Sequence, residues 1–278
     1  MPAGTDYCDH SRRRRNPLFE FLKTVHMNPD EYTNLNRLEG AHWYYAGKRE
    51  IVRYWLNYFH PMATSATLLD CGAGTGAFAA EMSAASGTTD AGRCKVVALD
   101  DHDESLEILR VKLGAENVVR GDCTHIPMAD AFCDYLTALD VIEHIPDDVG
   151  AVKEFVRVLK PGGLAVITVP ALQCLWSDWD LSLHHQRRYD RRQLTALLQA
   201  AGLEVLHVNY INVAAFPAVW FIRKRRAQGK QANTRRMEDS LPSPVINRIL
   251  KMLFVMPACQ RLVPFPFGVG LLAVAKKL

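Results

Sequence analysis

Short apolar runs alternate with amphipathic stretches along the chain from about residue 66, and this alternation is its main structural signal. The runs have the length of buried strands, whereas the stretches between them repeat their apolar positions at helical spacing. Strands are predicted at residues 67–69, 95–99, 117–120, 133–139, 164–169 and 203–208, and helices at 76–86, 104–113, 146–159 and 191–201. Strict alternation of strand and helix predicts an α/β fold whose parallel sheet has helices on both faces.

The segments on either side of this alternating region follow other patterns. Residues 17–59 carry apolar side chains at helical spacing, for example Ile51, Tyr54 and Trp55, so two or three helices are predicted there. Residues 1–16 are polar and arginine-rich, which is typical of a loosely held tail. After residue 211 comes an insertion with two apolar segments and a polar linker, and a last strand is predicted at 268–275.

The stretch LLDCGAGTGAF joins the first predicted strand to the first helix of the alternating region. Gly72, Gly74 and Gly76 permit a tight turn and leave backbone N–H groups accessible to a ligand. The glycines alone also fit a dinucleotide-binding loop. Asp70 favours another ligand, because a carboxylate repels a pyrophosphate but forms a charge-assisted hydrogen bond with an ammonium group. S-adenosylmethionine carries such an ammonium group.

Two more acids follow successive predicted strands. Asp100 ends KVVALD, where a carboxylate can accept hydrogen bonds from both hydroxyls of a ribose. Asp122, in VVRGDCTHIP, follows the next strand and can meet the amino group of an adenine. Each acid taken alone is equally consistent with a turn or capping role. Three acids at three strand ends, where open sheets bind ligands, favour a nucleoside ligand.

The order of motifs, LLDCGAGTG, VVALDDHDESL, GDCTHIPMADAFCDYLTALDVIEHI and LKPGGLAVITVP, resembles the Class I S-adenosylmethionine-dependent methyltransferases over residues 63–210. The similarity is greatest to their ubiquinone-pathway-like, methyltransferase type 11-like subgroup. It implies a Rossmann-like, seven-stranded, mostly parallel sheet with an antiparallel last strand. It also implies cofactor contacts by Asp70, Gly72, Gly74, Gly76, Asp100, Asp122, Cys123, Leu139 and Asp140. Asp101 departs from the family pattern, in which an apolar side chain packs on the adenine.

The resemblance also suggests how the chain is divided. Residues 1–62 are expected to form an N-terminal tail and helical lid, and 63–212 the cofactor-binding core. A helical insertion is expected at 213–264, and 265–278 would add the final strand. The aromatic residues at 43–45 are either lid or core residues.

Methyl transfer from a sulfonium mainly requires that the nucleophile be positioned and desolvated, and a histidine can take the proton of a hydroxyl acceptor. His144, in DVIEHI, directly follows the fourth strand, where family members bind the methyl group. The alternative is that Glu143 and His144 only cap the next helix.

The segment LWSDWDLSLHHQRRYDRRQL is too polar for core and too aromatic for a simple linker, so we expect it to cover the substrate. His185 and Tyr189 are its candidate catalytic residues; alternatively, Arg187 and Arg188 are surface charges and Tyr189 a packing residue. The segment resembles one in bacterial methyltransferases associated with cell-envelope or lipid-linked sugar pathways. No metal is expected, because the His184–His185 pair lacks an acidic or cysteine partner at a known ligand spacing.

The charge and the cysteine content of the chain bear on its binding partners and on the cellular compartment in which it works. A net charge of +3 does not indicate nucleic-acid binding, and seven scattered cysteines without a paired motif indicate a reducing cytoplasm. Seven basic residues and no acid lie between 223 and 236, next to apolar segments. The insertion is therefore expected either to touch an anionic membrane from the cytoplasmic side, or to cover the sheet and form a homodimer face or pocket wall.

The residues and the resemblance together predict S-adenosylmethionine-dependent methyl transfer to a small-molecule acceptor. Oxygen is the favoured nucleophile, and a lipid-linked or cell-envelope compound is one expected class of acceptor. A nicotinamide-dependent oxidoreductase is one alternative, although Asp70 and the lack of a Y-x-x-x-K motif argue against it. A cofactor-binding partner subunit without activity is the other.

Overall fold

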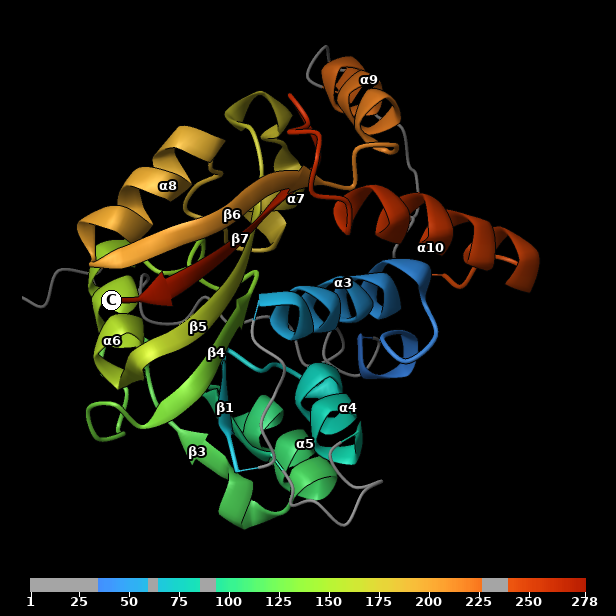
Figure 1. Cartoon of the computed structure of the whole chain (residues 1–278). Coiled ribbons are helices and arrows are strands. Elements are labelled where there is room, and N and C mark those ends of the chain that lie inside the picture. Colours follow the sequence, from blue (N-terminus) through green and yellow to red (C-terminus); the bar gives the residue numbers. More distant parts are fainter. Residues whose placement is uncertain (1–34, 60–64, 86–93, 227–239) are drawn as a thin grey trace, which may run out of the picture.

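A computed structural model of the chain describes residues 35–59, 65–85, 94–226 and 240–278. Its centre is a seven-stranded sheet with the order β3-β2-β1-β4-β5-β7-β6 (Figure 1). The strands are β1 (Thr67–Cys71), β2 (Lys95–Asp100), β3 (Val118–Arg120), β4 (Cys133–Leu139), β5 (Leu159–Pro170), β6 (Leu203–Ile211) and β7 (Gly270–Lys277). The predicted fold class is confirmed.

The sheet is parallel from β3 to β5, and β7 runs antiparallel to both of its neighbours. The chain fills one half of the sheet through β1, β2 and β3 and then returns to place β4 on the other side of β1. Ligands of open α/β sheets bind at the carboxyl ends of the strands where the order reverses in this way. The fold thus directs attention to the turns that follow β1 and β4.

Helices cover both faces of the sheet because alternate residues of each strand point to opposite sides. Leu69 belongs to the core formed with α6 and α8, whereas Leu68 belongs to the core formed with α3, α4 and α10. The α-helices are α3 (Trp43–Phe59), α4 (Ala77–Ala85), α5 (Asp103–Leu113), α6 (Asp148–Val158), α7 (Asp178–Ser182), α8 (Arg191–Ala200), α9 (Phe216–Arg226) and α10 (Pro244–Ala258). Short 3₁₀ turns lie at Ala115–Asn117 and Gln173–Leu175.

The insertion after β6 is helical, as predicted, and its second helix is joined to the N-terminal region. Trp55 of α3 donates its indole N–H to the carbonyl of Ala258 in α10 at 3.0 Å. A Cβ on Gly47 would lie 2.8 Å from the Phe254 ring, so the glycine allows the two helices to approach closely. α10 therefore packs on α3, and both lie on one side of the sheet (Figure 1).

One strand begins earlier than the sequence pattern predicts. The segment LKPGG looks like a turn, yet β5 starts at Leu159 and pairs it with Cys133 before the register shifts and Leu164 pairs with Tyr135. Gly162 has a φ of +79°, so the turn residues form an irregularity within the strand instead of a break before it. The helices expected before residue 35 and the linker at 229–234 lie outside the described residues.

Candidate functional site at the ends of β1, β2 and β4

The glycine turn after β1 is held in a backbone conformation that side chains rarely adopt. Gly72, Gly74 and Gly76 have φ values of +63°, +56° and +76°. A Cβ on Gly72 would lie 2.6 Å from Val141, and one on Gly76 would lie 2.4 Å from Leu109. A Cβ on Gly74 would meet no atom of the described residues within 4 Å. The first and third glycines therefore permit packing, while the second leaves open space at the mouth of the turn.

The amide groups of this turn are less available than predicted. Gly74 donates its N–H to Asp100 Oδ2 at 2.8 Å, and Gly76 donates to the carbonyl of Ala73 at 2.9 Å. Ala73 in turn donates to the carbonyl of Leu99 at 3.1 Å. The expectation that these glycines offer free N–H groups is wrong for Gly74 and Gly76, because tight turns satisfy their own donors. The turn contributes shape and open space instead.

Asp70 is buried at the carboxyl end of β1, with 3% of its surface exposed. Its Oδ1 accepts a hydrogen bond from the Thr137 hydroxyl at 2.6 Å. Burial raises the pKa of Asp70 to about 7; the Thr137 hydrogen bond opposes this shift, and the charge of Asp100 adds to it. A cation placed beside this carboxyl would stabilise its ionised form.

Asp100 and Asp122 lie at the predicted strand ends and already bond the neighbouring backbone. Besides Gly74, Asp100 accepts a hydrogen bond from the N–H of His102 at 3.0 Å. Hydrogen bonds to Asp100 and Asp101 raise the pKa of His102 to about 10. Asp122 is exposed and accepts the N–H of Thr124 at 2.7 Å, which forms a turn, while the neighbouring Cys123 is buried. A carboxylate oxygen has a second lone pair, so these bonds do not preclude ligand contacts.

Asp140, which follows Leu139 at the end of β4, is bound by a lysine that the sequence did not suggest. Its φ is +58°, and its carboxylate pairs with the buried amine of Lys48 in α3. Thr168 of β5 donates its hydroxyl to Asp140 Oδ1 at 2.9 Å. Although burial opposes both shifts, the pair lowers the pKa of Asp140 and raises that of Lys48. Helix α3 is thereby joined to the edge of the sheet that carries the site.

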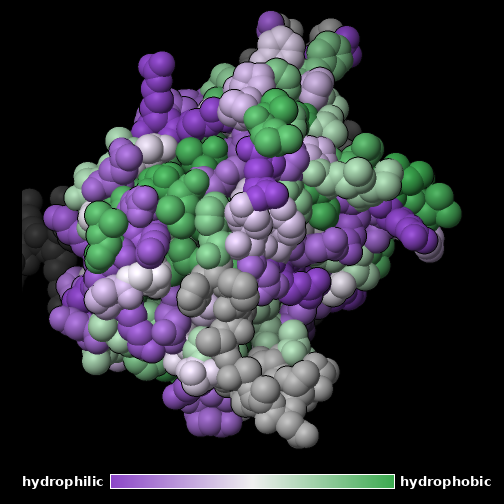
Figure 2. Space-filling model, viewed as in Figure 1, coloured by the Kyte–Doolittle hydropathy of each residue, from purple (hydrophilic) through white to green (hydrophobic). Residues whose placement is uncertain are grey.

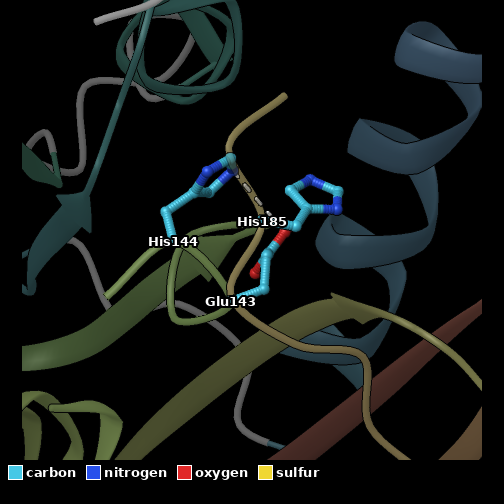
Figure 3. A group of neighbouring side chains, drawn as sticks. All are labelled: Glu143, His144 and His185. Atoms are coloured by element: carbon cyan, nitrogen blue, oxygen red, sulfur yellow. Dashed lines mark ion pairs between the residues drawn. The ribbon is translucent and has the colours of Figure 1, made fainter. Parts of the chain in front are cut away.

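Glu143 and His144 follow in the same turn, and the loop after α7 brings His185 against them (Figure 3). One ligand-type atom from each of the three side chains lies within 4.8 Å of the others. The Glu143 carboxyl points toward the two imidazole rings, whose centroids are 4.7 Å apart. Helix α6 is capped by Asp147, whose Oδ1 accepts the N–H of Gly150 at 2.9 Å. The interpretation of Glu143 and His144 as caps is therefore wrong.

Glu143 is the unusual member of this group. It is completely buried, and neither carboxylate oxygen has a hydrogen-bond partner among the described residues. Burial and the charge of Asp140 raise its pKa well above the ordinary value. Burial and the neighbouring His185 lower the pKa of His144 to about 4, so its imidazole is neutral near pH 7.

A buried ion-pair network orients His185. Asp180 Oδ1 is 3.0 Å from His185 Nδ1 and accepts the Arg188 Nε–H at 2.7 Å, and Arg223 of α9 approaches the other oxygen at 3.3 Å. Arg188 is buried, so the interpretation of it as a surface charge is wrong. Arg187 is half-buried and pairs with Asp148 at 2.8 Å. The loop is a packed structure whose basic side chains hold it together.

Tyr189 lies in the core beside α6. Its hydroxyl donates to Asp148 Oδ2 at 2.8 Å, and its ring belongs to the hydrophobic cluster beneath the sheet. Burial, followed by the bond to Asp148, raises the pKa of the phenol. This environment favours the packing role that the sequence left open.

Two residues of the site were missed, Lys48 and Glu143. The sequence held one signal for Lys48, which follows the aromatic residues 43–45 by about one helical turn. At that spacing the two side chains lie on one face of a helix, and the Lys48 amine is 4.5 Å from the centre of the Tyr44 ring. Glu143 directly precedes His144 in the sequence, yet a charged residue next to a candidate base is ordinarily solvated.

Comparison with known proteins finds similarity in the central region of the chain. Residues 69–167 match the family model described as "Methyltransferase domain". The central region of the chain is therefore similar to methyltransferase domains over these residues. The match covers β1 to β5 and therefore includes the glycine turn, Asp100, Asp140 and Glu143.

Curated relatives of this methyltransferase domain align with part of the chain. A probable S-adenosylmethionine-dependent methyltransferase of Mycolicibacterium smegmatis is 31% identical over 113 residues, which are 40% of this chain and 44% of that protein. Demethylmenaquinone methyltransferase of Staphylococcus aureus is 38% identical over 101 residues, 35% of this chain and 40% of that protein. The chain spans less than half the length of these relatives.

Solved structures share the fold over nearly the whole chain. Phosphoethanolamine N-methyltransferase 2 of Haemonchus contortus, in complex with S-adenosylmethionine, has a TM-score of 0.60 at 16% identity and covers 93% of this chain and 59% of its own. A structure of the complex between the Haloferax volcanii Trm112 methyltransferase activator and a methyltransferase has a TM-score of 0.58 at 17% identity. The match covers 91% of this chain and 97% of the matched chain. At these identities the likeness shows a shared fold.

Proposed function

We propose that this chain binds S-adenosylmethionine and transfers its methyl group to an oxygen atom of a small-molecule acceptor. The observation that carries the proposal is the buried carboxyl of Asp70 beside the glycine turn. Its raised pKa means that a bound cation would be needed to stabilise its charge, and the ammonium group of the methionine half supplies one.

The neighbouring strand ends account for the rest of the ligand. Asp100 would accept the ribose hydroxyls, and Asp122 with the backbone of Cys123 would meet the adenine. Leu139 and Asp140 would line the methionine half. Gly74, which faces open space, allows the ligand to approach the backbone closely.

When bound, S-adenosylmethionine supplies an electrophilic methyl group on a good leaving group. His144 is neutral near pH 7 and partly exposed, so it can accept the proton that a hydroxyl acceptor releases during transfer. The network around Asp180 fixes the imidazole of His185 beside it. We assign His144 as the proton acceptor and His185 as its neighbour in the acceptor pocket, whereas Tyr189 supports the loop from the core.

Calorimetric titration tests the proposal through the cofactor. The product S-adenosylhomocysteine is expected to bind wild-type protein in the micromolar range, and NAD is not. Asp70→Asn keeps the size of the side chain and an acceptor for Thr137 but removes the charge, so affinity for the product should fall at least about tenfold. Asp130→Asn, at an exposed carboxylate paired with Arg157, is the matched control. NAD binding, or an unchanged affinity in Asp70→Asn, would contradict the proposal.

The insertion has the character of a membrane-contacting surface, which would suit a lipid-linked acceptor on the cytoplasmic side. Phe254 and Ala258 of α10 are buried against α3. Other apolar residues of α10 are exposed: Val245, Ile246, Ile249, Met252, Leu253 and Met256. Figure 2 shows hydrophobic surface at the end of α10 and over α9. In the described ranges, no helix combines the length and apolar character needed to cross a bilayer.

The basic residues of α9 lie next to its exposed aromatic side chains. The Lys224 amine is 4.7 Å from the centre of the Trp220 ring, and the Arg225 guanidinium is 4.4 Å from that of Phe221. Exposed apolar side chains next to basic groups favour the headgroup layer of an anionic bilayer. The remaining basic residues of the segment, at 230, 235 and 236, lie outside the described residues.

Liposome flotation tests this surface. The protein is expected to float with vesicles containing phosphatidylserine and not with pure phosphatidylcholine, and Ile246→Ser with Ile249→Ser should abolish flotation. Val111→Ser, at an exposed apolar residue of α5, is the control. Failure to float, together with a dimer that the same two substitutions dissociate, would favour the homodimer face instead. A screen of lipid-linked sugars, quinone precursors and free acids with radiolabelled methyl donor would identify the acceptor.

A further inference from the structure

We propose that Glu143, His144 and His185 form a binding site for a divalent transition-metal ion, with Zn²⁺ as the best match. Two imidazoles and one carboxylate are the ligand set of catalytic zinc sites, in which three protein ligands leave one position open. The sequence did not suggest this site because two of the ligands follow β4 and the third comes from the loop after α7. Binding of the ion does not depend on the proposed methyl transfer; only its role in the reaction does.

The carboxylate of Glu143 gives the first argument. A fully buried carboxyl group ordinarily has hydrogen-bond partners, because an unpartnered buried polar group is costly. Both oxygens of Glu143 lack such a partner among the described residues, and one of them points toward the two histidines (Figure 3). A metal ion at this point would provide the missing partner.

The orientation of His185 gives the second argument. Its Nδ1 faces Asp180 Oδ1 at 3.0 Å, a contact that the neutral ring makes by donating from Nδ1, which leaves the lone pair of Nε2 for a ligand. Histidines that bind metals almost always donate their other ring nitrogen to a carboxylate or carbonyl in this way. Arg188 and Arg223 balance the charge of Asp180, so Asp180 orients the ring without attracting the cation itself.

The distances allow the three side chains to close on one ion. His144 Nε2 and Glu143 Oε1 are 3.9 Å apart, and the ligand atoms of all three residues lie within 4.8 Å of one another. Tetrahedral ligands at ~2.0–2.1 Å from zinc lie about 3.3 Å apart, so small side-chain rotations are sufficient. The Glu143 carbonyl accepts the N–H of Gln186 at 2.7 Å, which holds the His185 loop close to the β4 turn.

A second group of possible ligands is less suitable. Asp100, Asp101 and His102 also bring their polar atoms together. His102 there lies 2.6 Å from the Asp101 carboxylate and forms an ion pair with it, so the imidazolium already supplies the cation. Asp100 is further occupied by the amides of Gly74 and His102. The group at β4 is the one with vacant acceptors.

The site lies in the turn that also carries Asp140, at the edge of the sheet where the acceptor is proposed to bind. An ion with an open position would bind a hydroxyl or carboxylate oxygen of the acceptor directly. Coordination would lower the pKa of a bound hydroxyl, whose proton would pass to solvent water, so in the metal-bound form His144 is a ligand instead of the proton acceptor. This role rests on the proposed function and restricts the acceptor to oxygen ligands.

Metal binding is measured first without any substrate. Protein freed of metal is titrated with Zn²⁺ by calorimetry, and with Co²⁺ followed by visible absorption, which reports the geometry of the site. We expect one ion per chain, and at least about tenfold weaker binding in His144→Gln and in Glu143→Gln. His144 is partly exposed whereas Glu143 is buried, so His144→Gln should disturb folding less than Glu143→Gln does.

Two controls locate the ion. His184→Asn, which suits the left-handed backbone at that residue, and His102→Gln should both retain wild-type affinity for Zn²⁺. Absence of binding to wild-type protein, or affinity that His102→Gln reduces and His144→Gln does not, would overturn the proposal. S-adenosylhomocysteine titration of the same samples separates the two proposals, because wild-type protein that binds the product but not Zn²⁺ contradicts only the metal site.

Discussion

The glycine turn after β1 and the turn after β4 lie at the same edge of the sheet but are built in opposite ways. The glycine turn is contiguous in sequence, and the amides of Ala73, Gly74 and Gly76 are satisfied within the protein. The β4 turn holds a buried carboxyl without partners and depends on side chains from distant segments. The proposed cofactor half of the site is thus held by adjacent strands of the sheet, whereas the proposed acceptor half exists only when the loop after α7 is in place.

The largest effect should come from removing the support of that loop. Asp180→Ala leaves Arg188 buried without its carboxylate, so we expect a loss of about 3–5 kcal/mol in the free energy of unfolding. Urea denaturation measures it. Asp130→Ala breaks an exposed ion pair with Arg157 and should cost less than about 1 kcal/mol. Equal effects of the two substitutions would show that the loop does not depend on its buried pair.

A smaller loss of stability is expected in the glycine turn. Gly76→Ala puts a Cβ 2.4 Å from Leu109 in a left-handed conformation, which should cost about 2–4 kcal/mol in the free energy of unfolding. Gly74→Ala has a similar φ but open space around it, so only about 1 kcal/mol is expected. If both substitutions cost the same in urea denaturation, packing is not what distinguishes these glycines.

The smallest effect concerns the pH dependence of the cofactor half. The folded pKa of Asp70 is raised from 3.8 to about 7, so its protonated form contributes stability at low pH that is lost as pH rises toward 7. A ligand ammonium prefers the ionised carboxylate, and binding below pH 7 must therefore release a proton. Affinity for S-adenosylhomocysteine should fall by about tenfold from pH 8 to pH 6, or about 1.4 kcal/mol.

Calorimetry at the two pH values measures this difference. Asp70→Asn should bind weakly with little dependence on pH, since its side chain does not titrate in this range. A wild-type affinity that is constant from pH 6 to pH 8 would place the ammonium elsewhere.

The sheet, its helices and its strand-end acids were predictable because each depends on a pattern within a few residues of sequence. The early start of β5 was missed because Pro161 and Gly162 have local preferences for a turn, which pairing with β4 overrides. Lys48 and Glu143 were missed for another reason. Lys48 acts through its contact with Asp140, which lies 92 residues away in the sequence. Glu143 is distinguished by its burial. A distant contact and a buried position leave no pattern in the neighbouring sequence.

The pairing of Lys48 with Asp140 sets a lower limit on how far the chain can be shortened. A fragment beginning at β1 would keep every residue matched by the family model but would lose the amine that balances Asp140. The carboxylate would keep the Thr168 hydroxyl as a donor and have no cation beside it. Helix α3, although it precedes the matched region, therefore supplies the charge that balances Asp140 in the proposed site.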